Sequence, residues 1–307
     1  MSASSELRAN SVGRIIWKII AYILLTIFAF IMVFPFYFMI ITSVLTQDAF
    51  DGAAAHTPIL IPAIEQMTFD HYYKTFTMMT DGGGSFITYF VNTLVVAGVS
   101  TLVTVVTTLL AAFAFARLNF KGKDLLFMVI LATMMVPGEM MVITNYQSTA
   151  GFGWLNTFSA LILVHGVAVF YIFYLRQTFQ QIPNELYLAS KVDGYSDFQY
   201  FRKVMVPLAS PTIITIVILS VMGAWNSFIW PQLVASGTHP VLNNLFGVKW
   251  SMRLITNGVM SVFATEFNEN IPGRLAASLV TTIPLFIVFA FFRKKIMTGV
   301  SRSGIKG

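Results

Sequence analysis

The side chains that could perform catalysis or bind metal are few in this sequence and lie far apart. Cysteine is absent, which excludes thiolate chemistry, disulfides and cysteine metal ligands. The four histidines, His56, His71, His165 and His239, stand singly, and none belongs to a cluster with the spacing of a metal site. No Gly-x-x-x-x-Gly-Lys-Ser/Thr stretch is present to hold phosphates. We therefore expect a chain that is not an enzyme, binds no cofactor or metal itself and does not hydrolyse ATP.

A single carboxylate, Glu139, lies deep in an apolar stretch, directly after Pro137-Gly138. Moving a charged carboxylate to the middle of a bilayer costs about 3 kcal/mol, so we expect it to face the interior of a helix bundle or a wet cavity. There it could accept hydrogen bonds from sugar hydroxyls or act as a gate. It could equally pair with the backbone that Pro137-Gly138 opens, and both interpretations stay open.

Polar and aromatic side chains also lie near the far end of another apolar stretch, where Trp225, Asn226 and Trp230 follow one another closely. Such a group can stack on sugar rings, but aromatic residues also gather at membrane interfaces. Asn92 and His165, in two further apolar stretches, are expected to hydrogen bond across helices. The candidate residues for a translocation path are Glu139, Trp225, Asn226 and Asn92.

The elements that must position these residues are apolar helices. The chain is 56% hydrophobic and 10% charged, whereas soluble domains contain about 25% charged residues. We predict an all-α polytopic integral membrane protein with six spanning helices. Residues 15–44 are too long for a signal peptide and are read as a retained anchor, kinked at Pro35. The predicted spans are 15–44, 86–116, 125–146, 158–175, 207–235 and 275–292.

Basic residues indicate the orientation of these segments. With the N-terminus inside, all but four of the 19 Lys and Arg lie in inner segments, and only Lys74, Lys249, Arg253 and Arg274 lie outside. Because cytoplasmic loops are enriched in Lys and Arg, both termini are predicted to be cytoplasmic. The net charge of +6 is thereby explained by topology, without nucleic-acid binding.

One polar segment, residues 183–207, connects the fourth and fifth predicted spans on the cytoplasmic side. Its sequence predicts two short helices joined by a tight turn. Pro183 suits a first helical turn, Asp193-Gly194 a left-handed stop, and Ser196 with Gln199 a capping box. In the first helix Leu186, Ala189 and Val192 share one face, and in the second Phe198, Phe201 and Met205 do. Both helices therefore need a surface to lie against.

This segment resembles the EAA loop of ATP-binding-cassette (ABC) importer permeases. Ala189, Gly194 and Pro207 match the loop at its full spacing, and Ile182, Pro183, Glu185, Leu186 and Asp193 match its carbohydrate branch. Leu188 replaces the family's first Glu and Ser190 its second Ala, so one charged docking contact is absent or moved to Glu185. The alternative is an ordinary loop lying on the membrane surface. The resemblance implies an ATPase-docking site formed by Glu185, Ala189, Ser190, Asp193, Gly194 and Pro207.

The resemblance extends from about Asn92 to the C-terminus and is closest to carbohydrate permeases of the MalG-like branch. It is carried by the residues 112–123, by Trp225-Asn226-Ser227-Phe228 and by the terminal Gly-Ile-Lys-Gly. It implies a type I ABC importer permease (MetI-like) in the bacterial cytoplasmic (inner) membrane. The parts would be residues 1–85, with the tail, first span and external loop; a permease core, 86–293, including loop 183–207; and a cytoplasmic tail, 294–307.

The resemblance also implies partners. A homologous second permease would supply the other half of the path, and two ATP-binding subunits would hold ATP and Mg²⁺. An extracytoplasmic solute-binding protein would deliver a di- or oligosaccharide. Neither the identity of the sugar nor its direct contact with this chain follows from the sequence.

Two other classes of membrane protein remain as alternatives. A stand-alone secondary transporter or channel needs ion-coupling charges within the membrane, and Glu139 is the one carboxylate candidate. A membrane-embedded enzyme ranks last, because the sequence offers no paired carboxylates and no nucleophile with a base.

Overall fold

The computed structural model describes residues 3–54, 59–77, 79, 83–265 and 270–301. His56 and the terminal Gly-Ile-Lys-Gly lie outside the described residues. Throughout the described part the chain is helical, with isolated bridges but no strand, which confirms the predicted all-α fold. The chain divides into two units, Met1–Thr75 with Phe267–Val280, and Phe76–Glu266 with Thr281–Gly307.

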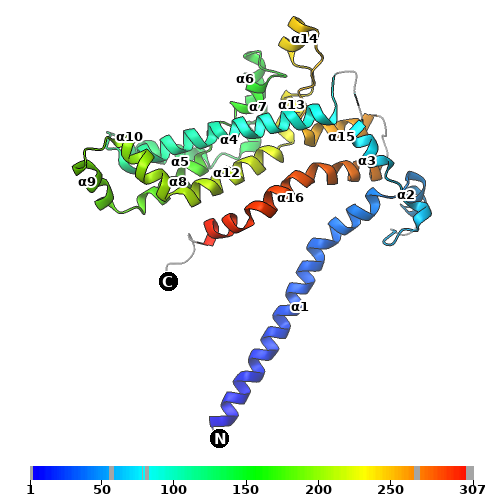
Figure 1. Cartoon of the computed structure of the whole chain (residues 1–307), viewed down its shortest axis with the longest axis horizontal. Coiled ribbons are helices and arrows are strands. Elements are labelled where there is room, and N and C mark those ends of the chain that lie inside the picture. The colour runs from blue at the N-terminus through cyan, green and yellow to red at the C-terminus, as the bar shows by residue number, and fades with distance from the viewer. Residues whose placement is uncertain (1–2, 55–58, 78, 80–82, 266–269, 302–307) are drawn as a thin grey trace. The chain divides into compact units, whose positions relative to one another are not determined.

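The first unit contains the first predicted span and most of the loop that follows it. Its elements are α1 (Ala3–Ser43), α2 (Gln47–Ala54), η1 (Ile64–Gln66), α3 (Asp70–Thr77) and the start of α16 (Ile271–Ser301). Helix α1 continues through Pro35, and none of its most apolar window is buried within the chain (Figure 1). A fully exposed apolar helix of this length is suited to lipid or to another protein in the bilayer.

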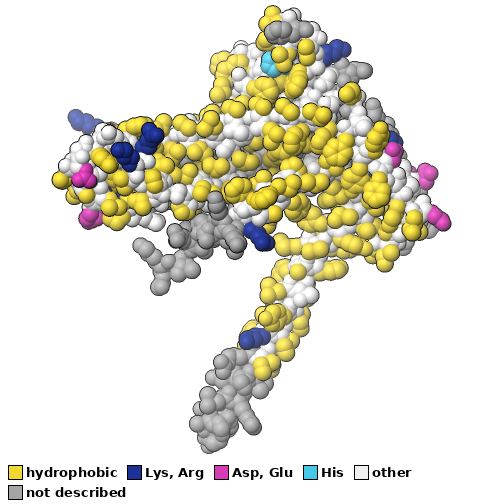
Figure 2. Space-filling view, in the orientation of Figure 1, with side chains coloured by type: hydrophobic (Ala, Val, Ile, Leu, Met, Phe, Trp, Pro, Cys, Tyr) yellow, Lys and Arg dark blue, Asp and Glu magenta, His cyan; other side chains and the backbone are white. Residues whose placement is uncertain are grey.

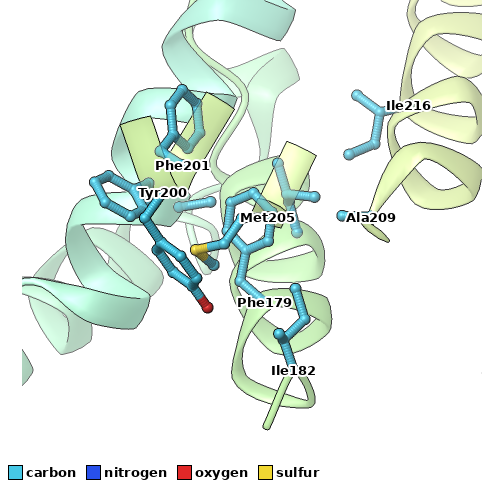
Figure 3. Packing of buried hydrophobic residues seen from close by; sticks show 10 residues of the cluster. Phe179, Ile182, Tyr200, Phe201, Met205, Ala209 and Ile216 are labelled. Atoms are coloured by element: carbon cyan, nitrogen blue, oxygen red, sulfur yellow. The ribbon is translucent and has the colours of Figure 1, made fainter. Parts of the chain in front are cut away.

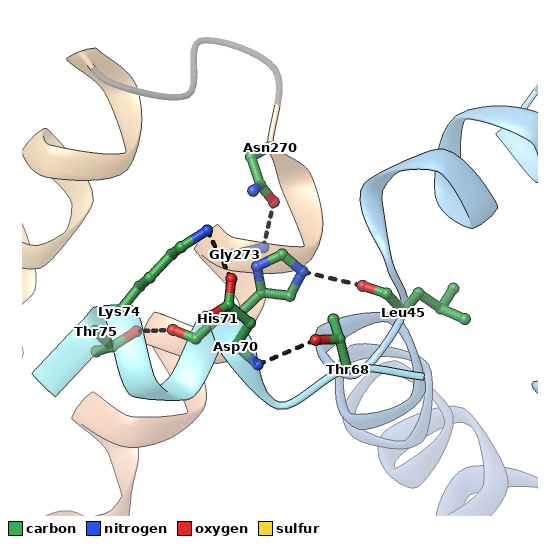
Figure 4. A network of polar contacts seen from close by, with 8 residues as sticks. All are labelled: Leu45, Thr68, Asp70, His71, Lys74, Thr75, Asn270 and Gly273. Atoms are coloured by element: carbon green, nitrogen blue, oxygen red, sulfur yellow. Dashed lines mark hydrogen bonds and ion pairs between the residues drawn. The ribbon is translucent and has the colours of Figure 1, made fainter. Parts of the chain in front are cut away.

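The loop after α1 contains short helices, and a buried histidine joins them to the end of α1. His71 on α3 is buried, and its Nε2 lies 3.0 Å from the carbonyl oxygen of Leu45 (Figure 4). Thr75 donates a hydrogen bond to the His71 carbonyl at 2.8 Å, and Lys74 pairs with Asp70 at 2.6 Å. Burial lowers the pKa of His71. This isolated histidine is therefore a structural residue of the loop.

The second unit is built around one long helix, α4 (Phe86–Arg117), which Ser85 caps. Helices α8 and α12 pack along it most extensively, and α5, α7 and α15 pack against it as well (Figure 1). The remaining elements are short segments that connect these helices. The bounds are α5 (Lys123–Thr133), η2 (Gly138–Met141), α6 (Val142–Gly151), α7 (Phe158–Ile162), α8 (Val169–Gln180), α9 (Asn184–Val192), α10 (Asp197–Tyr200), η3 (Phe201–Met205), α11 (Val206–Leu208), α12 (Ser210–Trp225), α13 (Ile229–Val234), α14 (Pro240–Phe246) and α15 (Ile255–Thr265).

Several predicted spans are broken rather than continuous. In the described residues three helices are long and apolar enough to cross a membrane, at Ile15–Ser43, Phe86–Arg117 and Ile271–Arg293. Two further pairs pass the same test but bend, by 83° at Pro137 and by 78° at Ala209. Predicted span 158–175 consists of α7 and α8, with residues 163–168 between them. Prolines explain the two bends, because a proline has no backbone N–H to donate to the preceding helical turn. Pro137 lies at the first bend, and Pro207 and Pro211 flank the second.

Two arginines fasten the ends of α4 and α8 to each other. Arg117, at the end of α4, donates to the carbonyls of Phe179, at 3.0 Å, and of Ile182. In the opposite direction, Arg176 on α8 donates to the Phe115 carbonyl of α4 at 3.2 Å. Both arginines thus donate to carbonyls at or just beyond helix ends, where acceptors are in excess. This pairing fixes the point where the chain leaves α8 for loop 183–207.

We predict that Arg117→Met destabilises the protein by about 1–3 kcal/mol, because two partly buried carbonyls lose a charged donor. The midpoint of thermal unfolding in detergent should fall accordingly. Lys121→Met is the control, since Lys121 is an exposed basic residue in the turn that follows α4. An equal fall in both variants would show that the Arg117 hydrogen bonds contribute nothing specific.

Candidate functional site

Loop 183–207 folds as the two predicted helices. Helix α9 begins after Pro183 and ends at Val192, Asp193 is its C-cap, and Gly194 then adopts a left-handed backbone with φ +80°. Ser196 Oγ accepts a hydrogen bond from the Gln199 backbone at 3.2 Å, while Gln199 Oε1 accepts one from the Ser196 backbone at 2.9 Å. This capping box starts α10 and sets the angle between the two helices.

A polar contact between α9 and α10 closes the loop on itself. Asp197 Oδ1 accepts a hydrogen bond from the Tyr187 hydroxyl at 2.8 Å and forms an ion pair with Lys191 Nζ at 2.7 Å. The hydrogen bond with Asp197 raises the pKa of Lys191 above its ordinary value. Tyr187 also packs edge-on against Tyr200, with ring centroids 5.0 Å apart. Both helices are therefore held as one body.

Packing joins this body to the long helices of the second unit. Tyr200, Phe201 and Met205 are buried and pack with Phe179 and Ile182 of the α8 end (Figure 3). The same cluster includes residues of α4 and α12, so three long helices meet the loop at one place. Burying each such side chain contributes about 1.5–3 kcal/mol. A force applied to α9 and α10 therefore reaches α4, α8 and α12 directly.

The buried face of the second loop helix differs from the predicted one. Phe201 and Met205 are buried as expected, but Phe198 is 62% exposed and Tyr200 takes its place in the cluster. The reason is that residues 201–205 form a π-helical turn. This wider turn rotates the side chains before it relative to those after it, so the α-helical spacing used for the prediction does not apply.

The outward surface of the loop is apolar and unpacked. Leu186, Leu188, Val192 and Phe198 are exposed, Val192 by 88%. Ala189 is exposed among them, and no heavy atom lies within 4 Å of where a Cβ on Gly194 would be. Large apolar side chains in this density on a polar segment are typical of a protein interface. We call this set of six residues the loop surface.

The predicted docking residues differ in their accessibility. Glu185, Asp193 and Pro207 are exposed, as are Ala189 and Gly194. Ser190 is buried instead, and its hydroxyl donates to the Tyr187 carbonyl at 2.7 Å. The sequence places Ser190 beside Ala189, but the helix turns its side chain inward. On the face shown in Figure 2, several Lys, Arg, Asp and Glu side chains lie at the α9–α10 end.

The candidate path residues are not brought together. Asn92 is fully buried: it accepts a hydrogen bond from Trp250 Nε1 at 2.8 Å and donates to the carbonyls of Ser251 and Arg253. Its amide therefore joins α4 to residues 250–253. Glu139 is exposed on η2 at the 83° bend between α5 and α6.

The aromatic group on the fifth predicted span has structural hydrogen bonds. Trp225 is buried and donates to the Thr281 carbonyl at 3.1 Å, whereas Asn226, at the end of α12, is exposed. Trp230 donates to the Ala160 carbonyl at 2.9 Å. Trp225 and Asn226 lie at the end of α12, between Ala224 and Ser227. Those two neighbours line a cavity, whereas Trp225 and Asn226 do not.

This cavity has a volume of about 220 Å³ and lies between α4, α8, α12 and the break between α7 and α8. Its polar lining residues include His165, Ser100, Thr104, Tyr171, Ser220 and Ser227. Of these, the sequence singles out only His165, as a residue that hydrogen bonds across helices. That prediction is wrong within the described residues, because His165 forms no such bond and packs against the Trp230 ring instead. Small hydroxyl residues in apolar helices carry no strong pattern, because they are also common at helix interfaces. Only the folded arrangement assembles them.

The chain matches the model of the family described as "Binding-protein-dependent transport system inner membrane component" over residues 104–301, more than half of its length. The inner membrane ABC transporter permease protein YcjP of Escherichia coli is 31% identical over 297 residues, which cover 96% of this chain and 98% of YcjP. The trehalose/maltose transport system permease protein MalG of Thermococcus litoralis is 28% identical over 298 residues, covering 96% and 99% of the two chains.

A solved structure shares the fold. The chain superimposes with a TM-score of 0.68 on a chain of a bacterial ABC transporter involved in the import of the acidic polysaccharide alginate. The match covers 96% of this chain and 98% of the other, at 19% sequence identity. The fold of this chain is therefore also found in an experimental structure.

We predict that Asp197→Ala loosens the loop, since Tyr187 and Lys191 both lose their partner on α10. Backbone amides of α9 should exchange hydrogen about two- to fivefold faster, as expected for exposed polar contacts. Hydrogen-exchange mass spectrometry of the purified chain measures this. Glu185→Ala is the control from the same loop. Unchanged exchange in Asp197→Ala would show that packing alone holds α9 in place.

Proposed function

Because this chain belongs to the family of binding-protein-dependent transport system inner membrane components, we propose that it is the permease subunit of an ATP-driven sugar importer. In this function it forms half of a path across the bacterial inner membrane and is moved by a separate ATPase that docks on loop 183–207. The observation that carries the proposal is the loop surface, which is apolar, exposed and packed from behind onto α4, α8 and α12.

A sugar as cargo is supported by the names of the relatives. Besides the trehalose/maltose permease, they include the arabinooligosaccharide permease AraQ of Bacillus subtilis, 27% identical over 241 residues, and the diacetylchitobiose permease NgcG of Streptomyces coelicolor, 26% identical over 286 residues. The cargoes in these names share hydroxyl-rich rings without a fixed charge. We propose the same chemical class for this chain.

Docking of an ATPase follows from what the loop offers. Leu186, Val192 and Phe198 would enter an apolar cleft, while Ala189 and Gly194 allow close approach of the backbone. Glu185 and Asp193 would supply charged contacts at the rim, in place of the Glu that Leu188 replaces. ATP and Mg²⁺ would be held by the ATPase and not by this chain. Closure of two ATPase subunits would then tilt the helices through the loop.

The remaining partners follow from exposed apolar surface. The segment around the 83° bend exposes Met135 by 84% and Met140 by 72%, beside Glu139. A homologous second permease would cover this segment and complete the path. A solute-binding protein would deliver the sugar from the outer side. We propose that the loop and both termini lie in the cytoplasm, a location supported by the basic residues near α9 and α10.

We predict that Gly194→Val abolishes ATP-dependent sugar uptake while the protein still inserts into the membrane. A β-branched residue disfavours the left-handed backbone by about 1–2 kcal/mol, which distorts the loop surface without unfolding the chain. Uptake into cells or proteoliposomes containing the complete importer measures the effect.

The matched control is Gly122→Val. Gly122 has nearly the same backbone, φ +79°, and equally open surroundings, but lies in the turn before α5. This variant carries similar strain and should keep most of the uptake. Loss of uptake in both variants, or in neither, would contradict docking at Gly194.

A second prediction tests the contact between α9 and the ATPase without straining the backbone. Ala189→Trp adds a large side chain to the exposed face of α9, where the structure has room but a docked ATPase would not. The variant should fold normally and fail to retain the ATP-binding subunit during purification in mild detergent. Normal retention together with normal uptake would show that the ATPase binds elsewhere.

A further inference from the structure

The cavity in the second unit has the features of a built site rather than of a packing defect. It lies where residues 163–168 interrupt a predicted span, and His165 and Ala168 of that interruption line it. Inside a bilayer, non-helical backbone is stable only when it is buried in protein or borders a water-filled cavity. A continuous helix from 158 to 175 would satisfy these backbone groups within the helix. The break is therefore expected to border a cavity that has a function.

Polar groups without protein partners face this cavity. His165 is exposed and Tyr171 and Ser220 are half-buried, and among the described residues no hydrogen bond joins the His165 imidazole or either hydroxyl to another protein group. They come from the α7–α8 break, from α8 and from α12. Each of these groups can both donate and accept hydrogen bonds, His165 in either neutral tautomer. Three such groups around one space match a ligand rich in hydroxyls.

An aromatic wall completes the lining. Trp230 is only 7% exposed, and its hydrogen bond to the Ala160 carbonyl holds the indole in place. His165 packs edge-on against it, with ring centroids 5.5 Å apart and planes at 69°. A fixed indole offers a rigid apolar surface, and the C–H face of a sugar ring is apolar as well. Trp230 can therefore bind one side of a ring whose hydroxyls reach the polar groups.

The size of the cavity limits the ligand. Its volume of about 220 Å³ lies between the roughly 150 Å³ of a cavity that takes benzene and the roughly 300 Å³ at which drug-sized pockets begin. The cavity therefore has room for one ring, and further rings of an oligosaccharide would extend out of its open side. Gly223 lines the cavity, and a Cβ built on it meets no heavy atom within 4 Å.

The charge of the cavity limits the ligand further. None of the residues that line it is Lys, Arg, Asp or Glu. A uronate ring would need a cation to compensate for its carboxylate on entering such a site. An amino sugar with a free ammonium would need an anion. The lining therefore fits a ring without charge.

We propose that this chain itself binds the cargo: one uncharged sugar ring occupies the cavity, packed on Trp230 and hydrogen bonded to His165, Tyr171 and Ser220. This inference rests on the proposed function and adds a substrate-contacting site to it. Binding one ring at a time lets an oligosaccharide pass through as a chain of similar units. It also makes the cavity select against acidic sugars.

The test uses the complete importer in proteoliposomes, loaded with ATP, and a panel of radiolabelled maltose, trehalose, diacetylchitobiose and an arabino-oligosaccharide. Gly223→Leu fills the cavity and should lower uptake of the transported sugar at least about tenfold. The ATPase rate stimulated by loaded solute-binding protein should stay within about twofold, because the loop is untouched. Gly98→Leu, on the exposed side of α4, also meets no atom within 4 Å and is the control.

His165→Ala and Ser220→Ala provide the second readout. Each removes hydrogen bonds to the ring and should lower uptake about two- to tenfold. Unchanged uptake in Gly223→Leu, or in both alanine variants if Gly223→Leu does not assemble, would overturn the proposal. If the unmodified importer takes up none of the four sugars, the proposed function fails instead. The two failures are thereby distinguished.

Discussion

The packing of Phe201 and Met205 against the end of α8 is the interaction on which the rest of this structure depends. A polar loop between two membrane helices would normally move independently of them. Here one hydrophobic cluster contains residues of the loop and of α4, α8 and α12, so the loop cannot shift without moving three helices. Arg117 and Arg176 fasten the helix ends behind it. The loop therefore acts as a rigid lever.

Away from the loop, the second unit has helix breaks that allow movement instead of rigid packing. Helices are interrupted there near Pro137 and at residues 163–168, and interruptions of this kind leave backbone groups that a bilayer cannot satisfy. Thr107 satisfies one of them by donating to the Gly166 carbonyl at 3.0 Å. Breaks of this kind allow helices to change their angle where a cavity lies between them. A rigid lever and a jointed interior together are what alternating access requires.

Local chemistry made much of this predictable from the sequence. Ser196 with Gln199, and Gly194 after Asp193, determine the loop helices through contacts between near neighbours in the chain. Long apolar runs likewise indicate the helices, because the length of each run is a local property of the sequence. The inward position of Ser190 and the replacement of Phe198 by Tyr200 were missed, because both depend on how helices wind and pack around the loop.

The cavity could not be predicted, because it depends on contacts between distant segments. Trp230 reaches Ala160 from 70 positions away, and Asn92 meets Trp250 at a separation of 158. No local pattern reports such pairs. Glu139 and Asn226 attract notice in the sequence because polar groups are rare in apolar runs, whereas His165 and Ser220 gain their meaning only from what lies opposite them.

The most direct test of the lever is a crosslink between the loop and the ATPase. Because the chain has no cysteine, Ala189→Cys introduces a single thiol at the exposed face of α9. In inverted membrane vesicles containing the importer, a short thiol-reactive crosslinker should join this residue to the ATP-binding subunit, with a yield that changes when ATP is added. A thiol that reacts only from the outer side of the membrane, or that never joins the ATPase, would contradict the account.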